Sequence, residues 1–302
     1  MTALRHLRLA MHAVLACWLI GDAAAVPPTA ETLRIAVHMG ALRDANRADV
    51  EVSLKLWAEE MAKVLEVPAE MRLYTSLVEV QNSMEAGRAN FVIADGMNLL
   101  RHFEPDALVD GFGGRGRTED NLVLVARKAA GIRSAKDLAG KRVVLLTGSE
   151  ISDLWLNTAC MRVLRQSCSQ AALTISKEKR SSQQVLKVFF NKADAALVRG
   201  YSYELAVELN PQVGEQLQII ERVPIYPGAL GLFSSQVSLP FRDYVIGKVP
   251  MLQNYPRGRQ IIEMLQSDRI DRLPRTALEP IRQLMHEHET LSARYALSQG
   301  KP

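Results

Sequence analysis

The stretch that decides the fold is SAKDLAGKRVVLLTGSEIS, which occupies residues 134–152. Residues 141–147 form a short apolar run rich in Val and Leu, which predicts a strand buried on both faces. Gly148 and Ser149 then turn the chain into a predicted helix over residues 151–164. Unpaired N–H groups at such a helix start bind anions or polar groups, but Gly and Ser also occur there simply as caps. The stretch therefore predicts an α/β protein and leaves both interpretations of the turn open.

Predicted strands and helices alternate on both sides of this stretch. Upstream, residues 31–103 alternate between strand and helix three times. Downstream, further strand–helix units span residues 173–209. After Pro240 the chain is predicted to be largely helical, with its last helix at residues 276–288 covering the first domain. Such alternation predicts mainly parallel sheets flanked by helices.

A glycine-rich segment, GFGGRGR at residues 111–117, lies between the two halves of this pattern. The phosphate-cradling loop of nucleotide enzymes needs a strand before it and a helix after it. Here the next segment, residues 121–127, is extended and apolar. We therefore interpret GFGGRGR as a flexible loop that crosses into a second domain.

The composition is that of a soluble globular protein. The 302 residues suffice for two domains, and 48% of them are hydrophobic while 23% are charged. The net charge of +4 is too small to argue for nucleic acid, and the sequence has no basic stripe with interleaved aromatic residues. We therefore expect no nucleic-acid partner.

Residues 1–25 have the features of a secretory signal peptide. Arg5 and Arg8 give a positive start, an apolar segment follows over residues 9–20, and an Ala-Ala-Ala triplet supplies a small-residue cleavage site. The apolar segment is too short for a permanent membrane span. Cys17 ends a Val-Leu-Ala-Cys sequence that loosely resembles a lipoprotein processing site, although the apolar segment continues past it. The sequence thus predicts export to the periplasm, with a lipid anchor as the alternative.

Two cysteines, Cys160 and Cys168, follow the signal peptide. On one continuous helix they would lie about 12 Å apart, which is too far for a disulfide. They could pair if the helix ended near Arg165 and the chain folded back. A metal pair is disfavoured because no histidine lies nearby to complete the ligands. Disulfide and separate thiols both remain open, and no metal or cofactor is predicted.

The order of these features resembles a known protein family. The segment Asp-Leu-Ala-Gly-Lys at residues 137–141 precedes a strand, and Ala-Asp-Ala-Ala at residues 193–196 belongs to another. With the signal peptide and two crossing segments near Arg127 and Val223, the chain resembles periplasmic solute-binding proteins of ABC transporters with the type II fold. Within that family it is most similar to the phosphate/phosphite/phosphonate-binding group.

The resemblance implies a two-lobed α/β fold in which each lobe is a mainly parallel sheet flanked by helices. Two crossing segments would form the hinge, and the ligand would lie between the lobes. Lobe 1 would comprise residues 26–125 and 226–302, and lobe 2 residues 126–225.

Candidate ligand-binding residues follow from the strand ends that would face the gap between the lobes. They are Met39, Thr75, Ser76 and Asp95 in lobe 1, Ser149, Glu150, Ser152, Ser182, Arg199 and Tyr201 in lobe 2, and Tyr226 after the second crossing. Several family positions differ here. An expected histidine is replaced by Ser181 or Ser182, and expected acidic residues are replaced by Tyr201 and Ala229.

The chemistry of these candidates leaves the ligand class open. Arg199 could hold a carboxylate or phosphoryl group with two parallel hydrogen bonds, or it could form a salt bridge to Asp95, Glu150 or Glu204. Asp95 could cap a helix or accept from an amine, and Ser149 and Ser152 could cap a helix or contact ligand. A phosphonate-like or phosphate-like oxyanion and a zwitterion therefore both fit.

These features predict an exported, monomeric solute-binding protein that serves an ABC importer. The sequence contains no Gly-x-Ser-x-Gly elbow and no His-Glu-x-x-His motif, so we expect binding and not catalysis. A sensor that presents its closed form to a membrane receptor kinase is the alternative. An exported enzyme is the third possibility.

Overall fold

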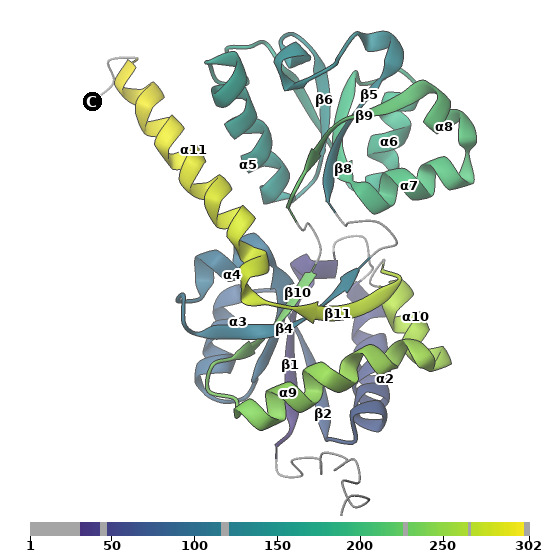
Figure 1. Ribbon diagram of the computed structural model, residues 1–302, viewed down its shortest axis with the longest axis vertical. Helices are drawn as coiled ribbons and strands as arrows, with labels where there is room; N and C mark the ends of the chain where they lie inside the picture. The colour runs from purple at the N-terminus through teal and green to yellow at the C-terminus, as the bar shows by residue number, and fades with distance from the viewer. Residues whose placement is uncertain (1–30, 43–46, 116–120, 226–228, 265–266, 299–302) are drawn as a thin grey trace, which may run out of the picture.

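A computed structural model describes residues 31–42, 47–115, 121–225, 229–264 and 267–298. The expected signal peptide with Cys17, and the candidate Tyr226, lie outside these residues. Within the described chain, no helix combines the length and the apolar character that crossing a bilayer would need. Two separate sheets form two lobes, which are stacked along the long axis of the molecule (Figure 1).

The first lobe contains a six-stranded sheet in the order β11-β4-β10-β3-β1-β2. β1 pairs in parallel with β2 and β3, whereas β10 runs antiparallel to β3 and β4, and β11 antiparallel to β4. The bounds are β1 (Leu33–His38), β2 (Ala69–Tyr74), β3 (Phe91–Asp95), β4 (Leu108–Arg115), β10 (Ala229–Ser234) and β11 (Arg269–Leu273).

The second lobe contains a five-stranded sheet in the order β7-β6-β8-β5-β9. β6 pairs in parallel with β7 and β8, whereas β5 runs antiparallel to β8 and β9. The bounds are β5 (Leu122–Arg127), β6 (Arg142–Leu146), β7 (Thr174–Glu178), β8 (Ala195–Arg199) and β9 (Leu217–Val223). The two-lobed α/β fold is thus confirmed. Both sheets are mixed, and the expected parallel pairing is found among β1, β2 and β3 and among β6, β7 and β8.

Helices flank both sheets (Figure 1). Those of the first lobe are α2 (Arg47–Leu65), α3 (Leu77–Glu85), α4 (Gly96–His102), α9 (Leu239–Lys248), α10 (Pro256–Met264) and α11 (Glu279–Ser298). Those of the second are α5 (Glu150–Ala159), α6 (Ser181–Phe189), α7 (Gly200–Leu209) and α8 (Pro211–Gln216). Short turns complete the set: η1 (Met39–Leu42), η2 (Lys128–Ala130), η3 (Ala135–Leu138), η4 (Cys160–Leu164), η5 (Val249–Asn254) and η6 (Arg275–Leu278).

The stretch at residues 134–152 folds as its sequence predicts. Ser134 caps η3, because its Oγ accepts from the backbone N–H of Lys136 while Asp137 accepts from the N–H of Ser134 at 2.9 Å. Gly140 leaves this turn at a φ of +68°, in the left-handed region that glycine tolerates. β6 follows, with Val143 and Val144 fully buried. The buried strand and the turn into α5 are therefore confirmed.

The glycine-rich segment is not the crossing loop that the sequence suggests. Most of it is the second half of β4, which lies between β10 and β11. A Cβ on Gly111 would lie 2.0 Å from the carbonyl oxygen of Gly231 in β10, so glycine permits a close approach of the two strands. The region after Pro240 is largely helical, as expected, and the strand β11, which the sequence does not predict, completes the sheet there.

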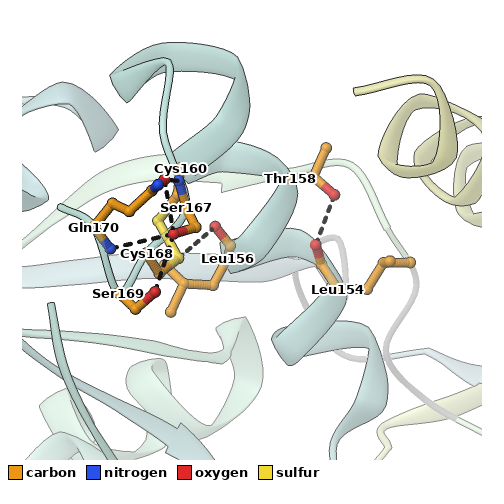
Figure 2. The surroundings of a disulfide bond; sticks show 8 residues. All are labelled: Leu154, Leu156, Thr158, Cys160, Ser167, Cys168, Ser169 and Gln170. Atoms are coloured by element: carbon orange, nitrogen blue, oxygen red, sulfur yellow. Dashed lines mark hydrogen bonds between the residues drawn. A yellow bond between two sulfur atoms is a disulfide. The ribbon is translucent and has the colours of Figure 1, made fainter. Parts of the chain in front are cut away.

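The segment after α5 brings the two cysteines together. α5 ends at Ala159, the π-helical turn η4 follows, and Arg165 reverses the chain at a φ of 59°. Cys160 and Cys168 form a disulfide with their Cα atoms 5.3 Å apart (Figure 2). The disulfide alternative is thus the one that the structure supports.

Candidate ligand-binding site

One edge of each sheet faces the other lobe. In the first lobe Asp95, at the end of β3, pairs with Ala229, where the chain returns from the second lobe. In the second lobe Leu122, where the chain arrives, pairs with both Arg199 and Val223. The connections between β4 and β5 and between β9 and β10 are short, and a chain spans at most about 3.5 Å per residue. These two edges therefore face each other across the lobes (Figure 1).

Three of the first-lobe candidates lie at this edge on turns that follow strands. Met39 begins η1 after β1 and is half-buried. Thr75 is exposed after β2, and Ser76 is the N-cap residue of α3 with an extended backbone. The Ser76 side chain makes no capping hydrogen bond within the described chain, so its hydroxyl is not committed to the helix.

Asp95 has a clear structural role. It is the N-cap of α4, and its Oδ1 accepts from the backbone N–H of Asn98 at 3.1 Å. Its Oδ2 accepts from the Asn98 side-chain amide at 2.5 Å. η1 also passes close by, since a Cβ on Gly40 would lie 3.8 Å from Asp95 Oδ2. The cap interpretation of Asp95 is therefore confirmed.

Two buried hydroxyls lie at the start of α5. Ser149 is the N-cap residue and Ser152 the third helical residue, and their Oγ atoms are 2.8 Å apart. Ser152 is 1% exposed and Ser149 7%. The hydroxyl pair uses one O–H to link the two oxygens, which leaves the second O–H able to donate elsewhere.

α6 offers another buried hydroxyl, but it is not the expected one. Ser182 is exposed, whereas its neighbour Ser181, the first residue of α6, is 4% exposed. Among the described residues, Ser181 Oγ has no hydrogen-bond partner. Gln184 fixes this helix on the sheet by donating to the carbonyl oxygen of Leu197 at 3.0 Å. Of the two serines that the sequence offers here, Ser181 is therefore buried and Ser182 faces solvent.

Arg199 and Tyr201 mark the turn between β8 and α7. Arg199 is the last residue of β8 and the N-cap residue of α7, and it is half-buried. Tyr201, the second residue of α7, is also half-buried. Both therefore belong to the edge that faces the first lobe, close in sequence to the paired Leu122.

Glu150 is engaged away from this turn. It is exposed at the first position of α5 and forms an ion pair with Arg101 of α4, so the contact joins the two lobes. The other acid of the first turn, Asp153, pairs with Lys177 of β7 at 2.7 Å. Both carboxylates at the start of α5 are therefore compensated by cations of the protein.

The second-lobe edge is suited to an anion. α5, α6 and α7 each begin directly after one of the parallel strands β6, β7 and β8, so their N-termini lie at the same edge. Free N–H groups and the helix dipole favour negative charge at such positions. Arg199 adds a formal positive charge there. Among the described residues, no cluster of three or more acidic, His or Cys side chains could hold a metal ion.

Comparisons with known proteins agree with this geometry. The family described as ABC transporter, phosphonate, periplasmic substrate-binding protein matches residues 39–273. No curated protein sequence matches the chain.

Solved structures show the same fold at low sequence identity. PhnD1 from Prochlorococcus marinus in complex with methylphosphonate has a TM-score of 0.60 and 14% identity, and the match covers 85% of this chain and 97% of that one. A binding protein component of an ABC phosphonate transporter from Pseudomonas aeruginosa has a TM-score of 0.53 and 11% identity, covering 86% and 87%. A Xanthomonas citri protein bound to ATP has a TM-score of 0.58 and 11% identity, covering 87% and 98%.

Proposed function

We propose, because this chain belongs to the family of periplasmic substrate-binding proteins of ABC phosphonate transporters, that it captures a small ligand with a phosphonate-like anionic group between its two lobes. It then delivers the ligand to a membrane permease as a monomer. The family consists of transport proteins and not of enzymes. Export by the signal peptide at residues 1–25 would place the chain in the periplasm, where this family works.

The observation that carries the proposal is the set of donors on one edge of the second lobe. Three helix N-termini, the Ser149–Ser152 hydroxyl pair and Arg199 lie there together. Ser181 adds a buried hydroxyl that has no partner within the described chain. Donors of this kind hold an oxyanion through several hydrogen bonds, and a guanidinium adds a charge-assisted one.

An oxyanion is favoured over a zwitterion by what the two acidic candidates do. Asp95 caps α4, and Glu150 pairs with Arg101, so both carboxylates already interact with groups of the protein. A ligand amine would have to compete with these groups. Two of the related structures contain methylphosphonate and ATP, which share an anionic phosphorus–oxygen group. A phosphonate or phosphate ester is therefore our preferred ligand class.

The two lobes are proposed to close on the ligand as rigid bodies. The sequence places lobe 1 at residues 26–125 and 226–302 and lobe 2 at residues 126–225. β5 lies wholly in the five-stranded sheet and begins at Leu122, so we move the first boundary to residues 116–121. The residues between the sheets would absorb the change in backbone angles.

A thermal-shift screen followed by calorimetric titration tests this function. The mature chain is screened with phosphate, phosphonates, sulfonates and amino acids. A ligand at a hundredfold excess over its dissociation constant stabilises the folded state by about 2.7 kcal/mol. The best hit is then titrated against Arg199→Ala and against Arg133→Ala, an exposed arginine of the same lobe that lies before η3.

We expect Arg199→Ala to weaken binding at least about 30-fold, because truncating one partner of a buried charge pair costs 2 kcal/mol or more. Arg133→Ala should bind like the wild type. Unchanged binding by Arg199→Ala would refute the site. Stabilisation by amino acids but by no oxyanion would refute the ligand class in favour of the zwitterion.

A further inference from the structure

The C-terminal helix belongs to one lobe and packs on the other. α11 follows β11 of the first lobe and then runs beside α5 of the second lobe (Figure 1). One buried apolar cluster contains Trp155 and Leu156 of α5 together with Ile281 and Leu284 of α11. α11 is therefore a third connection between the lobes, besides the two chain crossings.

Polar contacts fix where α11 lies on the second lobe. Glu287 accepts from Arg162 through two parallel hydrogen bonds, each of 2.6 Å, from Nε and Nη2. Further along α11, the Tyr295 hydroxyl donates to the carbonyl oxygen of Met161 at 3.0 Å, and Ser292 Oγ lies 3.9 Å from Met161 Sδ. Both second-lobe partners belong to η4.

The disulfide closes the loop that carries these partners. Cys160 begins η4, directly before Met161 and Arg162, and is bonded to Cys168 where the chain has turned back. Both sulfur-bearing residues are buried, and Cys168 Sγ lies 3.4 Å from the carbonyl oxygen of Leu156 in α5 (Figure 2). The bond therefore ties the returning chain at Cys168 to the start of the π-helical turn, beside the end of α5.

The charge of the same arginine also acts on Glu221 of β9, the strand that leads to the second crossing. Burial raises the pKa of Glu221 on β9, and the positive charge of Arg162 opposes that rise. Glu287 and Glu221 together hold the pKa of Arg162 above its usual value, with the Glu287 hydrogen bonds as the larger cause. Arg162 thus links the C-terminal helix to the disulfide loop by direct hydrogen bonds, and its charge also influences β9.

We propose that α11 is a clasp that keeps the two lobes together before ligand binds, and that the Cys160–Cys168 disulfide holds the second-lobe half of this clasp in place. Opening of the lobes then requires α11 to release Arg162 and Met161. The inference rests on the lobe movement of the proposed function, but its test needs no ligand.

The ion pair between Arg162 and Glu287 is partly exposed to solvent. The side chains of Arg162 and Glu287 are 40% and 38% exposed, so solvent screens the ion pair and its loss alone has a small effect. The variant Glu287→Gln with Tyr295→Phe removes the negative charge that pairs with Arg162 and the hydrogen bond to the carbonyl oxygen of Met161. It keeps the side-chain shapes and leaves the apolar contact of α5 with α11 intact. It therefore isolates the polar half of the clasp.

The distance between the lobes is measured by double electron–electron resonance in the ligand-free protein. Spin labels are attached to p-acetylphenylalanine at Val52 of α2 and Phe190 after α6, which are 71% and 62% exposed. This labelling chemistry leaves the disulfide untouched. We expect Glu287→Gln/Tyr295→Phe to show a longer mean distance and a broader distribution than the wild type.

The matched control breaks an ion pair inside one lobe. Glu66→Gln removes the negative charge that pairs with Lys248, in a contact that joins α9 to the residue that follows α2, and should leave the distance unchanged. Superimposable distributions for the wild type and the double variant would overturn the clasp. A shift of equal size in the control would overturn it as well, because the effect would then not be specific to α11.

The role of the disulfide is tested in the same way with Cys160→Ser/Cys168→Ser. This variant should lengthen and broaden the distance distribution as the double polar variant does. Circular dichroism shows whether this variant keeps the secondary structure of the wild type. A folded serine variant with the wild-type distribution would show that the disulfide does not hold the clasp.

Discussion

Asp194 shows what the recognisable motifs of this chain do. It is the acid of Ala-Asp-Ala-Ala and stands directly before β8. Its Oδ2 accepts from the backbone N–H of Arg142 at 2.8 Å, and its Oδ1 accepts from the Arg142 guanidinium at 2.8 Å. These bonds tie the start of β6 to the start of β8. The residue therefore serves the sheet, at the end opposite to Arg199.

We predict that Asp194→Asn lowers the free energy of unfolding by about 1 kcal/mol at pH 7, a modest value because Arg142 is nearly half exposed. The side-chain hydrogen bond from Arg142, together with its backbone N–H and its charge, holds the pKa of Asp194 below the ordinary value of 3.8. A depressed pKa gives stability that is present above about pH 4 and is lost as the pH falls through the folded-state pKa. The difference between variant and wild type should thus shrink below pH 4.

Urea unfolding at a series of pH values measures this difference. Asp106→Asn is the control, because Asp106 is 99% exposed in its contact with Arg275 and should change stability little. If the difference in unfolding free energy between Asp194→Asn and the wild type did not change with pH, ionised Asp194 would not stabilise the fold as predicted.

Single residues also show why the family could be predicted and the ligand contacts could not. The motif acids Asp137 and Asp194 bond to backbone N–H groups, and such local roles follow from residue type and spacing. Ser181 and Ser182 differ in burial although they are adjacent, since one step along a helix start turns the side chain away. Sequence spacing has an uncertainty of about one residue at such turns, and this is enough to exchange a buried hydroxyl for an exposed one.

At the scale of elements, β4 and β11 escaped prediction for a nonlocal reason. Glycine is depleted in strands, so a segment with four glycines is predicted as a loop. β4 nevertheless forms because β10 and β11, more than 100 residues later in the chain, pair with it on both sides. The sequence of the segment itself does not indicate these pairing strands. By contrast, β1, β3, β6 and β8 were predictable because their own apolar runs indicate burial.

We predict that Gly111→Ala destabilises the protein by about 3 kcal/mol, since the new Cβ would meet the backbone oxygen of Gly231 and the strands would have to separate. Gly247→Ala in α9 is the control of opposite sign. A Cβ there meets nothing within 4 Å, and alanine in a helix is favoured over glycine by up to about 1 kcal/mol. Denaturant unfolding measures the change in unfolding free energy for both variants. A neutral Gly111→Ala would mean that glycine is not required for this pairing.

At the scale of the whole molecule, the sequence predicted two lobes but not how closely they are joined. The last helix was expected at residues 276–288 as a cover for the first domain. α11 runs from Glu279 to Ser298, where it contacts α4 of the first lobe and also packs on the second lobe through α5. The chain beyond residue 288 still contains apolar residues, among them Leu291 and Tyr295, but an apolar helix face does not show which lobe it will contact. The position of α11 depends on the tertiary contacts of Arg162 and Met161.

This packing leads to a prediction about cooperativity. Lobes joined only by short crossings can unfold independently, and chains of this size often show more than one transition. Here the apolar cluster that includes Leu145 and Leu197 of the second lobe also includes Val92 and Leu230 of the first. We therefore expect the wild type to unfold in a single transition in differential scanning calorimetry, with equal calorimetric and van't Hoff enthalpies.

Two core variants distinguish a loss of coupling between the lobes from a general loss of stability. Leu284→Ala removes a buried side chain of α11 in the shared cluster and should separate or broaden the transition while costing about 2–5 kcal/mol. Val188→Ala removes a fully buried side chain from a cluster that lies wholly in the second lobe, and it should lower the melting temperature of one undivided transition. Two resolved transitions in the wild type would mean that the contact of α5 with α11 is too weak to couple the lobes. The clasp would then lack the apolar support on which its polar contacts depend.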